Sequence, residues 1–239
     1  MSNLSGTATP DAEFDVTSHW LDKETAATIS GERIRMVYAQ LRARGIRDER
    51  VLAAMSKVPR EEFAEADSLA QAYGDYPLPV DAGQTVSQPY IVASMVESLA
   101  LGAGDCVLEI GTGTGYQAAV LGEIAAEVWT VERVPELARK AQEILARLGY
   151  DKVHVVERDG TLGLPEHAPY PKILVAAAAP GVPESLIAQL AEGGSLVIPI
   201  GSRVEQQIHL IRKLNGEAVT TKRELCRFVP LVGQEGWKS

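Results

Sequence analysis

A loop with glycine at every second position directly follows the apolar residues 106–108, and it reads EIGTGTGYQ over residues 109–117. Its glycines, Gly111, Gly113 and Gly115, let the backbone adopt conformations that side chains disfavour and approach a ligand closely. In an open α/β sheet, such a turn after a strand is typical of a nucleotide-binding site, because the next helix begins beside the ligand. The spacing is G-x-G-x-G, whereas the dinucleotide fingerprint is G-x-G-x-x-G.

Two glutamates indicate the charge of the ligand. A carboxylate at Glu109, where the loop begins, would repel a pyrophosphate but suit a cation. S-adenosylmethionine carries a sulfonium and an α-ammonium, and its two ribose hydroxyls need an acceptor. Glu132 ends the next expected strand, about twenty residues after Gly111, as the ribose-binding acid does in the dinucleotide fold. We predict that Glu132 binds the ribose and that Glu109 acts indirectly, by orienting the loop or a bridging water.

A tight turn that only packs a helix against a sheet is the alternative interpretation of the loop. The succession of strand, acid, glycines, helix, strand and terminal glutamate favours a nucleoside cofactor instead, with S-adenosylmethionine ahead of NAD. Asp159-Gly160 follows the third expected strand, where a side-chain acceptor would meet the adenine amino group. An ordinary Asp-Gly turn fits the same local sequence.

A second segment, QTVSQP at residues 84–89, ends a long connection and begins a helix. Ser87 fits the N-cap of that helix and Pro89 fits its first turn, so capping alone would explain the serine. Ser87 has no histidine near it in the sequence and no G-x-S-x-G motif around it, which disfavours a serine hydrolase.

The elements that position these residues alternate between strands and helices. Strands are expected over 106–110, 128–132, 153–156, 172–176 and 195–200, and helices over 89–101, 115–125, 135–148 and 183–190. A hairpin is expected over 207–213 and 219–232, around the turn signal Asn215-Gly216. This order predicts an α/β fold with a doubly wound, mostly parallel Rossmann-like sheet and a C-terminal antiparallel hairpin.

The N-terminal part follows another pattern. Residues 1–28 are predicted to be a loose extension and residues 29–239 a single domain. A helix from Ser30 is expected to stop at Gly45, and a second helix to begin after Asp48 as its N-cap. The connection over residues 60–86 is rich in Pro, Gly and Asp, and loops of that length are usually functional.

Composition argues against several classes of protein. The net charge is −9 without a dense basic block, which disfavours nucleic acid as the main partner. No apolar run is long enough to span a membrane. Cys106 and Cys226 lie in or beside apolar runs and are expected to be buried, reduced thiols. The histidines are scattered without ligand spacing, so no metal site is expected.

Five separated motifs resemble the bacterial protein-L-isoaspartate O-methyltransferases. They are GQTVSQPY at 83–90, VLEIGTGTGYQAAVL at 107–121, AAAAP at 176–180, GGSLVIPIG at 193–201 and RFVPLVG at 227–233. The resemblance covers about residues 31–237. It implies the class I methyltransferase fold and methyl transfer from S-adenosylmethionine to the free α-carboxylate of L-isoaspartyl residues in damaged proteins and peptides. The methyl ester then closes to a succinimide, which begins the repair.

The resemblance also implies the site residues. Ser87 matches the functional serine of the family and is predicted to orient the acceptor carboxylate, which is already ionised and needs no general base. The residues expected at the cofactor are Gln84, Thr85, Glu109, Gly111, Thr112, Gly113, Thr114, Gly115, Tyr116, Glu132, Arg133, Asp159 and Gly160.

The alternative is a methyltransferase of the same fold that acts on a carboxylate of a specific peptide or small molecule. It is favoured by the N-terminal extension and by Arg158, which replaces a family glycine and would either point to solvent or crowd the adenine pocket. A binding protein without turnover is disfavoured because Ser87 and the glycine loop are intact. The chain is expected to act as a cytoplasmic monomer on isoaspartyl-containing proteins and peptides, without nucleic acid, membrane or metal.

Overall fold

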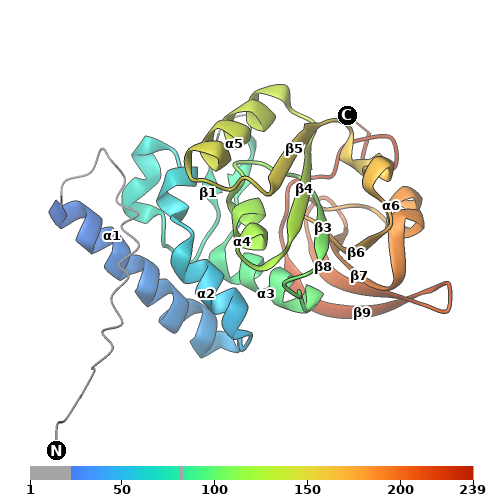
Figure 1. Ribbon diagram of the computed structural model, residues 1–239, viewed down its shortest axis with the longest axis horizontal. Coiled ribbons are helices and arrows are strands. Elements are labelled where there is room, and N and C mark those ends of the chain that lie inside the picture. Colours follow the sequence, from blue (N-terminus) through green and yellow to red (C-terminus); the bar gives the residue numbers. More distant parts are fainter. Residues whose placement is uncertain (1–22, 81–82, 239) are drawn as a thin grey trace, which may run out of the picture.

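The computed structural model describes residues 23–80 and 83–238. A seven-stranded sheet in the order β5-β4-β3-β6-β7-β8-β9 forms its centre, with helices on both faces (Figure 1). The parallel strands are β3 (Cys106–Ile110), β4 (Glu127–Glu132), β5 (Val153–Glu157), β6 (Tyr170–Val175) and β7 (Leu190–Gly201). The antiparallel strands are β8 (Gln206–Leu214) and β9 (Glu217–Cys226). The predicted fold class is confirmed.

Neighbouring residues of a central strand point into two separate cores. Val107 and Leu174 belong to the core on one face of the sheet, and Leu108 and Ile173 belong to the core on the other. Because both faces are covered, the central strands are apolar nearly throughout, as parallel strands usually are. This explains why short apolar runs marked them in the sequence.

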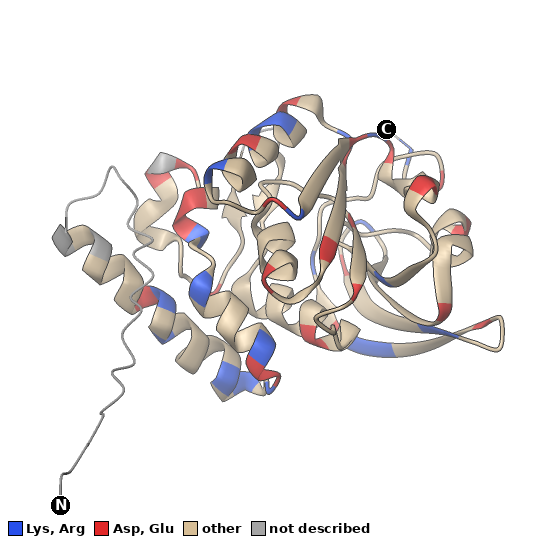
Figure 2. Ribbon diagram, viewed as in Figure 1, with Lys and Arg blue, Asp and Glu red and all other residues tan. Residues whose placement is uncertain are grey.

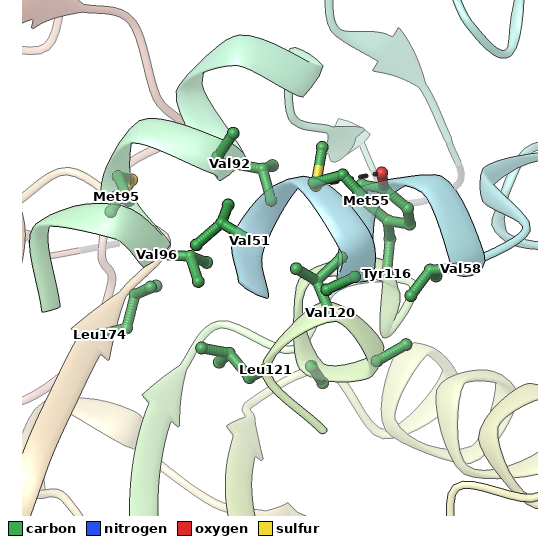
Figure 3. Close-up of a cluster of buried hydrophobic side chains, with 14 of the residues drawn as sticks. Val51, Met55, Val58, Val92, Met95, Val96, Tyr116, Val120, Leu121 and Leu174 are labelled. Atoms are coloured by element: carbon green, nitrogen blue, oxygen red, sulfur yellow. Dashed lines mark hydrogen bonds between the residues drawn. The ribbon is translucent and has the colours of Figure 1, made fainter. Parts of the chain in front are cut away.

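Side chains of the first core come from α2 (Glu49–Lys57), α3 (Pro89–Leu99), α4 (Tyr116–Ile124) and α5 (Pro135–Arg147), with Met36 added from the N-terminal helix. The second core is covered by α6 (Glu184–Gln189). Figure 3 shows Val51 and Met55 of α2 packed among Val92, Tyr116 and Val120 of α3 and α4. The Tyr116 hydroxyl donates to Met55 Sδ at 3.6 Å. Since α4 begins where the glycine loop ends and α3 begins after Ser87, this core fixes both segments.

The N-terminal helix begins earlier than expected. Helix α1 (Lys23–Met36) continues through a π-turn, Val37–Leu41, and a 3₁₀ turn, Arg42–Arg44. It stops at Gly45, where φ is +103°. The proposed boundary between residues 28 and 29 therefore falls inside a helix, while most of the proposed loose extension lies outside the described residues.

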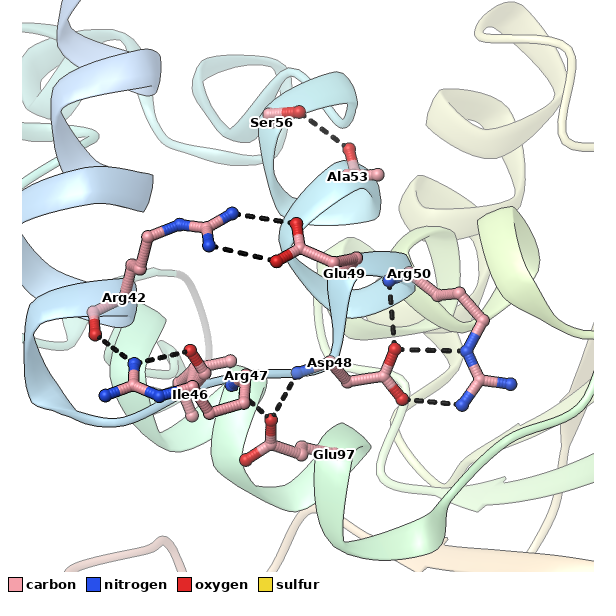
Figure 4. Close-up of polar contacts among 9 residues, drawn as sticks. All are labelled: Arg42, Ile46, Arg47, Asp48, Glu49, Arg50, Ala53, Ser56 and Glu97. Atoms are coloured by element: carbon pink, nitrogen blue, oxygen red, sulfur yellow. Dashed lines mark hydrogen bonds and ion pairs between the residues drawn. The ribbon is translucent and has the colours of Figure 1, made fainter.

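The turn between the first two helices is fastened to α3. The Asp48 carboxylate accepts from the Arg50 backbone N–H at 2.9 Å, so Asp48 caps α2 as predicted. Figure 4 shows Glu97 of α3 accepting hydrogen bonds from the backbone N–H groups of Arg47, at 2.6 Å, and Asp48, at 2.7 Å. Because one carboxylate oxygen accepts from two successive backbone N–H groups, this turn is held in a fixed position against α3.

The connection over residues 60–86 contains regular structure. It holds two 3₁₀ turns, Arg60–Phe63 and Ala66–Gln71, and two paired strands, β1 (Leu78–Pro79) and β2 (Thr85–Val86). Arg60 is fully buried, donates from Nε to the Ala72 carbonyl at 2.7 Å, and places its guanidinium 4.8 Å from the Tyr116 ring centroid. Such short turns leave no periodicity in the sequence, which is why this part was expected to be a loop.

Charged residues of both signs are interspersed over the surface (Figure 2). On α5, Arg139 pairs with Glu143 at 2.7 Å. Arg42 and Arg44, two of the basic residues before α2, pair with Glu49 and Asp75, each at 2.7 Å. Opposite charges are therefore adjacent around these arginines.

Two expectations, one about the C-terminal hairpin and one about the cysteines, are wrong. Strand β9 ends at Cys226, and residues 227–232 leave the sheet instead of extending it. Pro230 has no N–H for a ladder, and its neighbours Val229 and Leu231 form hydrogen bonds with Ala178, which follows β6, and not with β8. Both cysteines are free as expected, but both are partly exposed and not buried. Partial burial still raises the pKa of the Cys106 thiol to about 11.

Candidate active site

A cavity lies where β3, β4 and β6 end, at the edge of the sheet expected to bind a ligand. Together with the solvent space at its open mouth, it measures about 940 Å³. The predicted residues that line it are Gln84, Thr85, Ser87, Gly111, Thr112, Gly113, Thr114, Tyr116, Glu132, Arg133 and Gly160. Glu109, Gly115 and Asp159 are not part of the lining.

The three loop glycines have positive φ values but different surroundings. Gly111 (φ +94°) donates to the Val131 carbonyl at 2.8 Å, which ties the loop to β4. Gly113 (φ +54°) has no atom within 4 Å of the position that a Cβ would take. At Gly115 (φ +92°), a Cβ would lie 3.2 Å from Leu145 Cδ1 of α5. Gly113 therefore leaves open space beside the cavity, whereas Gly115 allows two helices to pack closely.

Glu132 is the acid at the cavity wall. Its side chain is nearly buried, and its two oxygens accept hydrogen bonds from the backbone N–H groups of Gly113, at 3.0 Å, and Val134, at 2.9 Å. A carboxylate oxygen can accept more than one hydrogen bond. Each oxygen of Glu132 accepts one from the backbone, so each can still accept one from a hydroxyl group of a ligand. The residues present thus fit a ligand with a pair of hydroxyls, such as a ribose.

Glu109 lies behind the cavity and not in it. Its Oε2 accepts from the Thr130 hydroxyl at 2.5 Å, and that hydroxyl is 2.7 Å from the hydroxyl of Thr112, which lines the cavity. Its Oε1 is buried and has no hydrogen-bond partner among the described residues. Complete burial raises the pKa of Glu109 to about 8. The negative charge expected beside the loop therefore does not come from Glu109 at neutral pH, and Glu132 is the glutamate that lines the cavity.

Ser87 lies in the cavity wall between β2 and α3. The N-cap of α3 is Gln88 and not Ser87, because the chain stays extended at Gln88 (ψ 135°) and Pro89 opens the helix. The Gln88 side-chain amide donates instead to the backbone carbonyl of Asp75, at 2.9 Å, and to its carboxylate, at 2.8 Å. The Ser87 hydroxyl makes no hydrogen bond within the described part of the chain, so it remains available to a ligand.

Asp159 is engaged away from the cavity. Its carboxylate accepts from the Thr161 N–H at 2.9 Å, the Thr161 hydroxyl at 2.7 Å and the Gln234 N–H at 2.8 Å. Burial opposes ionisation here, but these hydrogen bonds hold the pKa of Asp159 below its ordinary value. Its neighbour Gly160 does line the cavity, and a Cβ there would lie 2.6 Å from Ile110 Cγ2.

The two placements left open for Arg158 are now distinguished. Its guanidinium donates to both carboxylate oxygens of Glu166, each at 2.9 Å, and it is not among the residues that line the cavity. Arg158 therefore points to the surface. It no longer favours the alternative of a methyltransferase that acts only on a specific peptide or small molecule.

Several apolar residues of the wall were not expected from the sequence: Ile110, Val131, Val134, Ala176 and Val229 line the cavity. Residues 177 and 230–232, which belong to the stretches expected to recognise an acceptor peptide, line it as well. Ile110 and Val131 end or nearly end strands just before predicted polar site residues, and that position was the signal that could have found them. No cluster of His, Cys, Asp and Glu suited to a metal occurs within residues 23–80 and 83–238, and none of the helices described there is long and apolar enough to cross a membrane.

Sequence comparison matches nearly the whole described chain to one family. The model of the protein-L-isoaspartate(D-aspartate) O-methyltransferase (PCMT) family matches residues 32–236. A protein-L-isoaspartate O-methyltransferase of Koribacter versatilis is 54% identical over 206 residues, which are 86% of this chain and 93% of the relative. Protein-L-isoaspartate O-methyltransferase 2 of Pelobacter propionicus is 57% identical over 205 residues, which are 84% of this chain and 91% of the relative.

Solved structures give the same result. A protein-L-isoaspartate O-methyltransferase has a TM-score of 0.78 at 32% identity, with 85% of this chain and 67% of the other covered. A Plasmodium falciparum protein, described as a PCMT in complex with S-adenosyl-L-homocysteine, has a TM-score of 0.72 at 26% identity, with 82% and 96% covered. The fold is that of a class I methyltransferase, a class that depends on S-adenosylmethionine. Within that class, the chain belongs to the protein-L-isoaspartate(D-aspartate) O-methyltransferase family.

Proposed function

We propose that this protein methylates the free α-carboxylate of L-isoaspartyl residues in damaged proteins and peptides, and that Ser87 binds the acceptor. The observation that carries the proposal is the Ser87 hydroxyl. It lines the same cavity as Gly113 and Glu132, and it has no hydrogen-bond partner among the described residues. A hydroxyl without a partner at a cavity wall is a donor ready for a carboxylate.

The chemistry requires little from the protein beyond alignment. S-adenosylmethionine supplies a methyl group that its sulfonium already activates. An acceptor carboxyl with a pKa of about 4 is ionised at neutral pH and needs no general base. None of the residues that line the cavity is a histidine or a lysine, which agrees with this requirement. Ser87 would hold the acceptor carboxylate in line with the methyl group by donating one hydrogen bond.

Glu132 and the glycine loop would hold the cofactor. The Glu132 carboxylate, already oriented by the backbone N–H groups of Gly113 and Val134, would accept from the ribose hydroxyls. The open space beside Gly113 would admit the ligand backbone closely. Gly160 would leave room for the adenine ring, and Asp159 would support that wall through Thr161 and Gln234.

A peptide acceptor needs an open groove that tolerates varied side chains. We infer that residues 76–80, 177–180 and 230–232 recognise the acceptor backbone. Their positions support this: β1 within the first stretch pairs with β2 next to Ser87, and the other two stretches include residues of the cavity wall. Equal binding of isoaspartyl and aspartyl peptides would contradict this groove.

The setting of the protein is also proposed. We infer a monomer that works in the cytoplasm and does not bind nucleic acid. Two free cysteines, Cys106 and Cys226, suit a reducing compartment, and a net charge of −9 suits a protein acceptor better than a polyanion. Sedimentation velocity would test the monomer, fractionation of cells the location, and a gel-shift assay with DNA and RNA the absence of nucleic-acid binding.

The test is methyl transfer from radiolabelled S-adenosylmethionine to a matched pair of peptides, one isoaspartyl and one aspartyl at the same position. We expect label in the isoaspartyl peptide alone. Label in both peptides would contradict the specificity. Label in neither, with S-adenosylhomocysteine still bound in calorimetry, would instead favour an acceptor carboxylate on a specific peptide or small molecule.

A further inference from the structure

The wall formed by residues 229–232 is held by a single residue of the segment after β6. The Ala178 N–H donates to the Val229 carbonyl at 2.8 Å, and the Leu231 N–H donates to the Ala178 carbonyl at 2.7 Å. These bonds form an isolated parallel bridge between Ala178 and Pro230. Two hydrogen bonds outside the main sheet are a weak attachment for a surface that must keep its place beside a ligand.

The chain after this wall turns back and adds a second attachment. We call residues 233–238 the C-terminal clasp. Within it, Trp237 donates from its backbone N–H to the Leu231 carbonyl at 2.8 Å and from its indole Nε1 to the Ala178 carbonyl at 3.0 Å. The Ala178 carbonyl therefore accepts from the wall and from the clasp together. A Cβ on Gly236 would lie 2.2 Å from the Leu231 carbonyl oxygen, so the return requires glycine.

Three other parts of the fold anchor the clasp. The Gln234 N–H donates to Asp159 at 2.8 Å, just after β5. Glu235 accepts from the Ser185 backbone N–H of α6 at 2.9 Å and from the Ser185 hydroxyl at 2.6 Å. The Arg203 guanidinium lies 5.0 Å from the Trp237 ring centroid. Figure 1 accordingly shows the C-terminal end of the chain beside the ends of β4 and β5.

We propose that Trp237 is a positioning residue for the acceptor peptide, because its indole N–H holds the wall at residues 229–232 in place. This inference rests on the proposed function. Glu132 and the glycine loop, which would hold the ribose end of the cofactor, take their hydrogen bonds from other parts of the chain than the clasp. The clasp reaches the proposed adenine side through the bond from Gln234 to Asp159, and that bond does not involve the Trp237 indole. Loosening the wall should therefore weaken acceptor binding and leave cofactor binding and the methyl-transfer step unchanged.

Trp237→Phe removes the indole N–H and keeps an aromatic ring for Arg203. We expect the KM for an isoaspartyl peptide to rise about fivefold, as the loss of one neutral hydrogen bond implies. The kcat should stay within about twofold, and so should the Kd for S-adenosylhomocysteine. Trp129→Phe is the matched control, since its indole Nε1 has no partner among the described residues and its ring stacks on His154 and His167. It should leave the KM unchanged.

Hydrogen–deuterium exchange makes the test independent of the acceptor. The Leu231 amide should exchange faster in Trp237→Phe than in wild type, with no such change in Trp129→Phe. An unchanged KM together with unchanged exchange would overturn the inference, even if the melting temperature fell. A parallel loss of S-adenosylhomocysteine binding would assign the wall to the cofactor and overturn it too. A wild-type protein inactive on isoaspartyl peptides would contradict the proposed function, while exchange at Leu231 would still decide whether Trp237 holds the wall.

Discussion

The carboxylate of Glu132 accepts a hydrogen bond from the backbone N–H of Gly113 at 3.0 Å. The end of β4 and the middle of the glycine loop are thus joined by the same side chain that faces the cavity. The loop positions the acid and the acid positions the loop, so a ligand that bonds to Glu132 meets a surface that is already ordered. Preorganisation of this kind lowers the entropy cost of binding.

We predict that Glu132→Gln weakens S-adenosylhomocysteine binding by about tenfold or more, because a charged acceptor contributes more than a neutral amide. Isothermal titration calorimetry measures the change. Glu157→Gln is the control, since Glu157 pairs with Glu132 in strand register but is exposed. Equal weakening in both variants would mean a general electrostatic effect and not a ribose contact.

Ser87→Ala should lower the turnover of an isoaspartyl peptide by about tenfold, because a hydroxyl that aligns the acceptor is lost. The Kd for S-adenosylhomocysteine should not change. Steady-state kinetics with a labelled methyl group would show the difference. Ser56→Ala serves for comparison: the Ser56 hydroxyl donates to the Ala53 carbonyl on α2, outside the cavity (Figure 4). Wild-type turnover in Ser87→Ala would remove the serine from the mechanism.

The stability of the ligand-free protein should depend on pH through Glu109. Burial raises its pKa to about 8 in the folded protein, while the unfolded value is near 4.3. The folded state therefore binds this proton more tightly. The resulting stabilisation is complete below the unfolded pKa and is lost as the pH rises through the folded one. Between pH 5 and 8, Glu109 should lower the free energy of unfolding by about 1 kcal/mol per pH unit.

Urea denaturation at several pH values, on wild type and Glu109→Gln, isolates this contribution. The glutamine has the shape of the protonated acid and cannot ionise, so the variant should show a flatter pH profile over the same range. If the free energy of unfolding changed with pH equally in the two proteins, Glu109 would be ionised in the folded state. Its Oε1 would then need a hydrogen-bond donor that the described residues do not supply.

Gly115→Ala should destabilise the fold by about 1–2 kcal/mol, because an L side chain disfavours a left-handed backbone. The new methyl would also lie 3.2 Å from Leu145 Cδ1, and α5 would have to shift. Gly104→Ala is a suitable reference, because a Cβ there meets open space and its φ is not positive. Chemical denaturation compares the two. A Gly115→Ala protein as stable as the reference would contradict the packing role.

The order of elements and the glycine loop could be predicted from the sequence because each depends on neighbours in the chain. The strands are short apolar runs bounded by polar residues, and burial on both faces of the sheet requires that pattern. Loop conformations with positive φ require glycine, and Gly111, Gly113 and Gly115 have them. Glu132 could be predicted as a site residue because it ends the strand that follows the glycine loop, where the sheet edge meets the cavity.

The tertiary structure decided how the polar side chains are used. Asp159 is bound by Gln234, a residue far away in the sequence, so its attachment to the C-terminal clasp could not be deduced from the Asp-Gly pair. Ser87 is not an N-cap because α3 begins one residue later, with the extended Gln88 as its N-cap and Pro89 in its first turn. Glu109 is the same residue type as Glu132, yet one is sealed in the core and the other faces the cavity.

Local sequence thus determined which backbone conformations and which chain order are possible, since sterics and apolar patterning act between near neighbours. Protonation, hydrogen-bond partners and access to the cavity depend on which distant segments pack around each group. Burial raised the pKa of Glu109, and the backbone N–H of Gln234 in the C-terminal clasp donates to Asp159. Only the folded structure brings those segments together, and the free energy of a polar group is set by its surroundings.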